Sequence, residues 1–390
     1  MPISRQKMKK ANAATVFSLI RYSEGISRNA IAQITALSPS TITLIVDDLI
    51  KRELVEETEF LREPWEDAQI GRHPIGLKVC EKKYKLIGLE YSEASICAGL
   101  FDFTCAIPLK MIRRTTSVNS SPAKEAIEII HELIADCGVD NIVGVGLGVP
   151  GVVDVAHKNI LLSIPMQAED INIGEEISHA VGLPVFVENE SKLMGLYEKQ
   201  KYYQDVDTFV YISVSTGIGG CIIKRNKFLM GGVGTTGEIG HMSINYSGQI
   251  CHCGNHGCLE TYASTKAMIE QASKRMIAAS DHTQMKIREI ADAFHAGDKI
   301  AAEIVMENAG FLAVGMINLV NLINPTTIVV GGDVLAFGER YFDEIKRKVL
   351  SGALRPYSRH VDVIGAHAFD IPVASGAAML AADELIYSII

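Results

Sequence analysis

The stretch that decides the fold is NIVGVGLGVPG, residues 141–151, in which small and β-branched residues run without a polar break into a glycine-proline turn. A run that is apolar at every position predicts a strand buried on both faces of a sheet. Three more strands end in the same way, in glycines or polar residues: LPVFVENES (183–191), TFVYISVSTGIGGCII (208–223) and TTIVVGGDV (326–334). A single glycine turn usually serves chain reversal, but four such turns favour one shared ligand cleft.

The segments around these strands alternate between strand and helix patterns. KLIGLE (85–90) and SICAGLFDF (95–103) are expected to pair as strands, and SPAKEAIEIIHELIADC (121–137) has the period of an amphipathic helix. A helix-rich region follows over about 261–322. This alternation predicts an α/β fold with three layers and mostly buried sheets, in which ligands bind at the carboxyl ends of the strands.

The chain has 390 residues, too many for one ordinary core, so two or three domains are expected. It contains no run of about 18 apolar residues and no signal-peptide pattern, so we expect a cytoplasmic protein without membrane insertion. Charge is unevenly spread. Residues 1–52 hold eight Lys or Arg and three acids, a net +5, so the rest of this chain of net charge −9 carries −14. A basic N-terminal region, here called the head, is thus joined to an acidic remainder, here called the body. This suggests a module that binds a polyanion, followed by a module with another function.

The basic head is predicted to contain two short helices with a tight turn. Ser27 can cap the first helix, whose inner face would consist of Ile31, Ala32 and Ile34. Ser38 and Pro39 suit the N-cap and first position of a second helix that runs to about Lys51. That helix would bury Ile42, Ile45, Val46 and Leu49. The pattern predicts a helix-turn-helix, with RELVEE (52–57) leading into the strand of a wing.

Small hydroxyl side chains stand on the exposed face near the start of this second helix, where they can reach phosphates and base edges. In IGRHPIGLKV (70–79) a turn would place Arg72 at its tip, and such an arginine can enter a narrow minor groove. The candidate DNA-binding residues are Arg28, Ser38, Ser40, Thr41, Thr43 and Arg72. The alternatives are an ordinary helical hairpin and a solvated arginine. Glu53 stands where winged helices often have a helix-ending glycine, so we expect a less sharp turn there.

Three of the eight cysteines cluster in CHCGNHGCLE, residues 251–260. With one upstream histidine they form a sufficient set for a closed tetrahedral site, which predicts structural Zn²⁺ on His241, Cys251, Cys253 and Cys258. His252 and His256 are rivals for the fourth place, but they lie tight against the cysteines. A redox dithiol usually has two residues between its cysteines, and a DNA-reading finger needs basic residues after the knot, where this chain has LETYAST (259–265). The remaining cysteines stand singly in apolar runs and are expected to be buried thiols in a reducing compartment: Cys80, Cys97, Cys105, Cys137 and Cys221.

The carboxylates Glu238 and Glu260 bracket this knot in the sequence. A metal that pins both ends of the loop would therefore also fix these two acids relative to one another. Rigid paired acceptors suit the recognition of adjacent hydroxyls, as on a pyranose. The sequence thus indicates a sugar site beside the metal site.

The order of motifs over about residues 84–390 resembles the ROK family of bacterial repressors, open reading frames and sugar kinases. The motifs are GVGLGVPGVVD (144–154), ENES (188–191), STGIGG (215–220), GEIGHM (237–242), CHCGNHGCLE (251–260) and NPTTIVVGGDV (324–334). The family implies an actin-like, two-lobed sugar-kinase fold of the ribonuclease H-like type, a sugar in the cleft between the lobes, and a homodimer or homotetramer. The helix-turn-helix is similar to that of the repressor branch. We therefore expect a winged-helix DNA-binding domain at 1–80 and a sugar-binding domain at 81–390, with lobes of about 81–187 plus the C-terminal helix and about 188–375.

The resemblance also implies which residues hold the sugar. They would be Gly151, Asn189, Glu190, Glu238, His241 and Glu260. His241 would serve the zinc through one ring nitrogen and the sugar through the other, because a ligating imidazole donates its second N–H to a further partner.

Two departures from the kinases of the family predict that the chain is not an enzyme. Their phosphate loop reads Asp-x-Gly-Gly-Thr-Lys, whereas EYSEAS (90–95) has neither the glycines nor the lysine, so ATP should bind poorly. Glu190 replaces the catalytic aspartate, and the displaced carboxylate alone could lower the rate about a hundredfold. We expect a sugar-responsive repressor that binds operator DNA and a small sugar or sugar-derivative inducer. The alternatives are an ATP-dependent hexose kinase with a DNA-binding head, and a regulator controlled by a transport-system protein partner.

Overall fold

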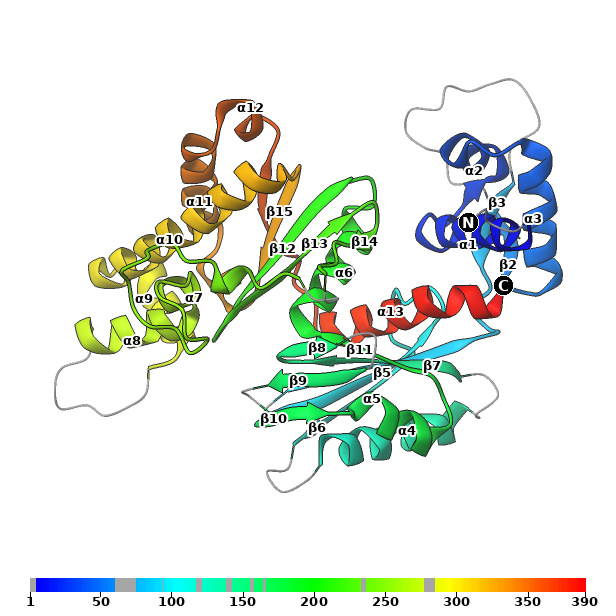
Figure 1. Cartoon of the computed structure of the whole chain (residues 1–390), viewed down its shortest axis with the longest axis horizontal. Coiled ribbons are helices and arrows are strands. Elements are labelled where there is room, and N and C mark those ends of the chain that lie inside the picture. The colour runs from blue at the N-terminus through cyan, green and yellow to red at the C-terminus, as the bar shows by residue number, and fades with distance from the viewer. Residues whose placement is uncertain are drawn as a thin grey trace. The chain divides into compact units, whose positions relative to one another are not determined.

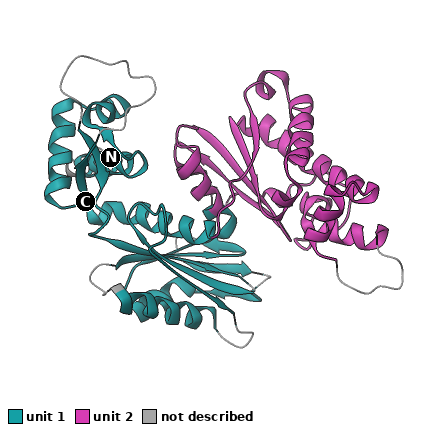
Figure 2. Ribbon diagram, turned by 180° about the vertical axis from the view of Figure 1, so that it is seen from behind, with its two compact units in different colours: residues 1–193, 371–390 teal, residues 194–370 magenta. Residues whose placement is uncertain are grey.

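The computed structural model divides into two compact units, residues 1–193 with 371–390 and residues 194–370 (Figure 2). We refer to them as the first and the second unit and describe each by itself. The residues that the structure describes are 5–59, 75–92, 94–116, 121–137, 142–154, 158–163, 166–232, 236–276 and 285–390.

The first unit is built on a five-stranded sheet with the order β11-β7-β4-β5-β6. Its strands are β4 (Lys85–Tyr91), β5 (Ser95–Asp102), β6 (Lys110–Thr115), β7 (Ile142–Val149) and β11 (Val185–Asn189). β4, β7 and β11 are parallel, and β5 is antiparallel to both of its neighbours. A smaller antiparallel sheet consists of β8 (Val152–Asp154), β9 (Asn159–Ser163) and β10 (Ala168–Ile171). The expected pairing of residues 85–90 with residues 95–103 is confirmed, because β4 and β5 pair antiparallel.

Alternating glycines in β7 explain how the sheet is covered. α13 (Pro372–Ile389) lies against β4 and β7 (Figure 1). A Cβ added at Gly146 would collide with the carbonyl oxygen of Ala377, and one at Gly88 with that of Ala374. The side chains that alternate with glycines along β7, such as Leu147, point to the other face of the sheet. There they pack into a core with α4 (Pro122–Cys137) and α5 (Ile173–Val181). The glycine face therefore lets a helix backbone lie directly on the sheet, while the other face supplies the apolar core.

The second unit has a five-stranded sheet with the order β14-β13-β12-β15-β16. This is the strand order of the first sheet read from its other edge, β6-β5-β4-β7-β11. Its strands are β12 (Thr208–Val214), β13 (Ile218–Lys224), β14 (Lys227–Phe228), β15 (Thr327–Gly331) and β16 (Asp362–Gly365). β12, β15 and β16 are parallel, and β13 is antiparallel to its neighbours. The two sheets thus share one topology, the duplicated ribonuclease H-like arrangement of an actin-like fold, and the expected α/β class is confirmed.

Helices make up most of the rest of the second unit. They are α6 (Glu190–Tyr202), which begins in the first unit, α7 (Glu260–Ala263), α8 (Thr265–Arg275), α9 (Ile287–His295), α10 (Lys299–Ile323), α11 (Glu339–Gly352) and α12 (Arg355–Ser358), with the 3₁₀ turns η2 (Ile239–His241) and η3 (Asp333–Phe337). By length and composition, α10 alone among the described helices could cross a membrane. Its buried residues, such as Leu312 and Leu319, belong to the core of this unit. An apolar helix buried in this way is typical of a protein core.

The head, residues 1–80, belongs to the first unit, and its described residues, 5–59 and 75–80, form three helices and a three-stranded sheet in the order β1-β3-β2. Its elements are α1 (Arg5–Tyr22), β1 (Ile26–Ser27), α2 (Arg28–Thr35), α3 (Pro39–Lys51), β2 (Val55–Thr58) and β3 (Gly76–Val79). The Oγ atom of Ser27 accepts a hydrogen bond from the Ala30 amide at 3.2 Å, and that of Ser38 accepts one from the Thr41 amide at 3.2 Å. Both predicted N-caps are confirmed, and α3 buries all four expected residues.

The predicted inner face of α2 is wrong at one position. Ile31 is fully buried, but Ile34 is 62% exposed. The inner face continues from Ile31 to Thr35, one turn later, where the Thr35 hydroxyl donates to the Ile31 carbonyl at 2.7 Å. Because Ile34 lies off this stripe in a helix of only two turns, it does not reach the core.

The expectation of a less sharp turn at Glu53 is also wrong. Glu53 has φ 56°, in the left-handed region. Its amide donates to the Ile50 carbonyl at 2.8 Å, and the Leu54 amide donates to the Leu49 carbonyl at 3.0 Å. These two bonds form a complete Schellman motif, with buried Leu49 and Leu54 as its apolar pair. The hydrogen bonds and the apolar contact hold a non-glycine residue in a conformation that is unfavourable by about 1–2 kcal/mol.

Candidate functional site: a His-Cys cluster beside carboxylates

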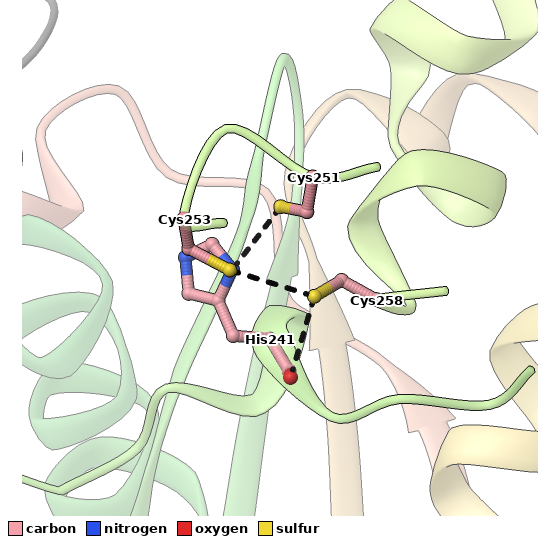
Figure 3. Close-up of side chains that lie close together, drawn as sticks. All are labelled: His241, Cys251, Cys253 and Cys258. Atoms are coloured by element: carbon pink, nitrogen blue, oxygen red, sulfur yellow. Dashed lines mark hydrogen bonds between the residues drawn. The ribbon is translucent and has the colours of Figure 1, made fainter. Parts of the chain in front are cut away.

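Four side chains of the second unit meet in a cluster that fits a metal ion (Figure 3). The ligand atoms of His241, Cys251, Cys253 and Cys258 all lie within 4.8 Å of one another. The Sγ atoms of Cys253 and Cys258 are 3.7 Å apart, and Nδ1 of His241 is 3.6 Å from Sγ of Cys251. Tetrahedral zinc requires about 3.8 Å between two sulfurs and about 3.5 Å between sulfur and nitrogen. The cluster therefore has the dimensions of a zinc site.

Glycines shape the loop that carries these cysteines. Gly254 and Gly257 have φ 87° and 70°, and a Cβ at Gly257 would collide with the carbonyl of Asn245. The rival His256 turns Nδ1 to the Gly248 carbonyl at 3.2 Å and so points into the loop backbone. The other rival, His252, does belong to a second possible set, which consists of His241, Cys251, His252 and Glu260. The geometry thus leaves two overlapping donor sets that share His241 and Cys251.

Glu260, the first residue of α7, is held beside the cluster by the turn between β12 and β13. One of its carboxylate oxygens accepts a hydrogen bond from the Ile218 amide at 2.9 Å, and the other lies 3.3 Å from Nδ1 of His252. A Cβ at Gly217 would stand only 2.7 Å from the first oxygen, so any other residue there would displace the Glu260 carboxylate. The glycine turn and the cysteine loop together fix this carboxylate.

Glu238 directly precedes the short turn η2, and His241 ends it. The His241 amide donates to the Glu238 carbonyl at 3.1 Å, and the Glu238 side chain is exposed. Because Nδ1 of His241 faces Cys251, its Nε2 is the nitrogen left for another partner. Glu238, His241 and Glu260 therefore form one set of candidate ligand residues, all within the second unit.

Gly151, Asn189 and Glu190 form a second set, within the first unit. The Asn189 side-chain amide donates to the Gly151 carbonyl at 2.8 Å, and its oxygen accepts from the Ser191 and Lys192 amides at 2.9 and 3.3 Å. Asn189 thus caps α6 and ties it to the strand-end turn. One N–H of its side chain remains for a ligand.

Glu190 has an unusual environment. Burial, together with the nearby carboxylate of Glu90, raises the pKa of Glu190 to about 7. Burial also raises the pKa of Glu90, against the opposing influence of Arg113. Near neutral pH, Glu190 therefore exists partly as a neutral carboxylic acid, which can donate a hydrogen bond as well as accept one.

The candidate DNA-binding residues of the head are tied to one another more than the sequence suggested. The hydroxyl of Ser38 lies 3.0 Å from that of Ser40 and 2.8 Å from that of Thr41, and Thr43 donates to the Pro39 carbonyl at 3.0 Å. Arg28 forms ion pairs with Asp47 at 3.4 Å and Glu57 at 3.1 Å. Arg72 lies outside the described residues.

A model of the ROK family matches residues 88–384. The chain belongs to the ROK family. The xylose repressor of Bacillus subtilis (strain 168) is 28% identical over 358 residues, which cover 90% of this chain and 89% of that protein. The ROK relationship extends over the whole body and both candidate sets.

Two solved ROK structures differ in how much of this chain they match. A ROK family transcriptional regulator, described as a homologue of the Escherichia coli MLC protein, covers 98% of this chain and is itself covered to 97%, with 26% identity and a TM-score of 0.81. A ROK hexokinase from Thermus thermophilus covers 77% of this chain and is itself covered to 99%, with 28% identity and a TM-score of 0.67. The hexokinase thus leaves nearly a quarter of this chain unmatched, whereas the regulator leaves almost none.

The sequence did not single out Glu90 as a site residue. It is the residue before last of β4 and the first residue of EYSEAS (90–95), which stands where ROK kinases have their phosphate loop, and a polar residue near a strand's carboxyl end was the available signal. In this chain the turn after β4 is closed on itself. The Ser92 amide donates to the Ser95 carbonyl at 2.9 Å, and the Ser95 amide donates to the Ser92 hydroxyl at 3.1 Å. These two N–H groups are therefore not free to bind a phosphate.

Proposed function

We propose that this ROK protein is a sugar-responsive transcriptional repressor of carbohydrate metabolism genes that binds operator DNA and does not phosphorylate sugar. The observation that carries the proposal is the difference in coverage. A transcriptional regulator matches 98% of the chain and a hexokinase only 77%. The family match begins at residue 88, after the basic head. The curated relative that matches 90% of the chain is named a repressor.

In this proposal the head is a winged helix-turn-helix DNA-binding domain, and α3 is its recognition helix. α2 and α3 are joined by a short turn, and β2 and β3 pair antiparallel as a wing would. Residues 1–52 carry a net charge of +5, which favours contact with phosphates. Because a dimer presents such heads to half-sites about 34 Å apart or a multiple of that, we expect a homodimer or homotetramer.

The proposed metal is one structural Zn²⁺ on His241, Cys251, Cys253 and Cys258. Three thiolates and one imidazole fill the coordination shell, which leaves no open position for catalysis. A bound zinc would fix the loop and, through it, the position of Glu260. The six residues of the two sets are the proposed sugar ligands.

The proposed inducer is a neutral sugar. Lys192, next to the first set, is paired with Glu188 at 3.2 Å, and both side chains are nearly buried. Acidic side chains are prominent in both sets, and carboxylates suit sugar hydroxyls better than they suit phosphate. The Bacillus subtilis relative is a xylose repressor, which makes xylose the first sugar to try.

α13 provides a physical connection between the sugar-binding body and the head. It begins directly after the second unit ends at Asp370, and it lies on β4 and β7. Near its far end, Asp383 binds the fully buried side chain of Arg21 at 2.6 Å, and Arg21 also donates to the Phe103 carbonyl at 2.7 Å. A shift of α13 would therefore change the position of α1. A transport-system protein could act on the same connection between α13 and the head. The location that fits the proposed function is the cytoplasm.

A kinase assay separates this proposal from an ATP-dependent hexose kinase. Zinc-loaded protein is incubated with MgATP and a panel of neutral pentoses and hexoses, and ADP release is followed. We expect no sugar-dependent release, because the turn after β4 uses two of its amides internally and Glu190 is displaced from the position of the aspartate. A hexose-dependent signal that disappears in Glu190→Ala would establish the kinase instead.

A further inference from the structure

The outer face of α3 carries an exposed leucine at its centre. Leu44 is 72% exposed, while Ile42, Ile45, Val46 and Leu49 on the opposite face are buried. Ser40 and Asp47, one turn before and after Leu44, are also exposed. In a helix-turn-helix, the outward face of the second helix is the one that enters the major groove. Leu44 therefore stands where that helix would meet base edges.

The hydrogen-bond donors of this face are already engaged. The Thr43 hydroxyl donates to the Pro39 carbonyl at 3.0 Å, which leaves that side chain a methyl group and acceptor lone pairs. The hydroxyls of Ser40 and Thr41 both contact the Ser38 hydroxyl, at 3.0 and 2.8 Å. The start of α3 thus has few donors free for the O6 and N7 atoms of guanine.

The cations that usually read guanine are also missing from this face. α3 contains no arginine, and its one lysine, Lys51, is its last residue. Arg28 of α2 is held by Asp47 and Glu57, and Arg52 by Asp48 at 3.0 Å. Guanine is most often recognised by a bidentate arginine or lysine. The chemistry that remains at the middle of α3 is apolar contact, and the apolar group in the major groove is the C5-methyl of thymine.

We propose that Leu44, assisted by the methyl group of Thr43, reads thymine methyl groups in the major groove. A·T pairs would then occupy the part of each half-site that faces the middle of α3. The inference rests on the proposed DNA-binding function and deepens it, because it names the base and the side chain that selects it. Leu44 is a specificity-determining residue in this account, and phosphates are contacted by other parts of the head.

The test removes the methyl group from the DNA and the side chain from the protein. Full-length protein first selects its best duplex from a random pool, and each thymine of that duplex is then replaced singly by deoxyuridine. We expect one or two positions per half-site where wild-type protein binds the uracil duplex about fourfold more weakly, the value of one buried methyl group. Leu44→Ala should lose most of this preference for thymine over uracil at those positions. Its affinity should match that of wild-type protein for the uracil duplex within about twofold.

Ile34→Ala is the matched control, because Ile34 is also exposed but lies on α2. It should keep the full preference of the wild type for thymine. The inference is overturned if wild-type protein binds every uracil duplex as tightly as the thymine duplex. It is also overturned if Leu44→Ala binds the thymine duplex and the uracil duplex more weakly by the same factor and so keeps the wild-type preference for thymine. If the pool yields no enriched duplex, the proposed repressor function fails and the inference fails with it. Because Leu44 is exposed, Leu44→Ala should unfold at the same temperature as wild type, which checks that the variant is folded.

Discussion

Cys258→Ser is expected to abolish zinc binding, from one Zn²⁺ per chain to none. Cys258 is fully buried and its Sγ lies 3.7 Å from that of Cys253, so its loss breaks a closed four-ligand shell. A structural zinc contributes about 10–16 kcal/mol of binding free energy in small peptides, most of which depends on the complete shell. The measurement is the metal content of purified protein by mass spectrometry, together with its thermal unfolding.

Two matched variants assign the donor set. Cys253→Ser should lose the metal as Cys258→Ser does, whereas His252→Ala should keep it, because the proposed shell contains Cys253 and not His252. His256→Ala serves as control, since His256 contacts the Gly248 carbonyl. If His252→Ala loses the metal and Cys253→Ser retains it, the set with His252 and Glu260 is correct. A full complement of zinc in Cys258→Ser would contradict the proposed shell, which requires that thiolate.

The metal should matter for sensing as well as for stability. Glu260 is fixed between the Ile218 amide and His252, directly after the cysteine loop. Loss of zinc would loosen that loop while leaving α1, α2 and α3 of the first unit intact. Chelation should therefore weaken the sugar response before it unfolds the head, and an unchanged sugar response without zinc would show that the cluster does not position Glu260.

Glu190→Gln is expected to stabilise the protein at pH 8 by up to about 3 kcal/mol and to have little effect at pH 4. The pKa of Glu190 rises from 4.5 to about 7 in the folded protein, because of burial first and Glu90 second. Below pH 4.5 the carboxyl is neutral in both states. As the pH rises toward 7 the unfolded state ionises first, so the folded state progressively loses stability. Glutamine remains neutral throughout and removes this loss.

Urea denaturation of wild type and Glu190→Gln at pH 4, 6 and 8 measures the effect. The difference between the two proteins should grow with pH and level off above about pH 8. Glu128→Gln, on the exposed face of α4, is the matched control and should change the midpoint little at any of the three pH values. A constant difference between Glu190→Gln and wild type at all three pH values would show that Glu190 ionises normally. In Glu90→Gln, the loss of stability that arises from Glu190 should be smaller and should level off at lower pH, since one cause of the raised pKa of Glu190 is removed.

Local patterns predicted much of the fold correctly. Ser27 and Ser38 cap their helices as expected, and Leu147 and its neighbours in β7 are buried. These features depend on periodicity and on hydrogen bonds within a few residues, which the sequence displays directly. The cluster of His241 and three cysteines was predicted for the same reason, because its four residues span only residues 241–258 and their spacing is a strong signal.

The errors and omissions concern effects that depend on tertiary contacts. Ile34 had the spacing of a core residue, yet α2 is too short to bury it. Glu53 adopts a left-handed conformation in a motif whose hydrogen bonds join Leu54 to Leu49 and in which both leucines are buried, and no local propensity indicates this. Glu90 and Glu190 are close in space although about a hundred residues separate them in the sequence. Their proximity depends on how β4 and α6 pack in the folded chain, and local sequence patterns do not show this. The shared topology of the two sheets was implied only by the resemblance to the ROK family, because strand order does not show in local sequence patterns.

The central claim is that a sugar bound in the body controls DNA binding by the head. It is tested most directly by the affinity of zinc-loaded, full-length protein for its selected duplex, measured by fluorescence anisotropy with and without neutral sugars, beginning with xylose. The account predicts that at least one sugar changes the dissociation constant by about fivefold or more, the lower range of allosteric coupling. Glu260→Gln should reduce that change without altering the affinity in the absence of sugar. Equal affinity with every sugar, in protein that holds its zinc, would contradict the account.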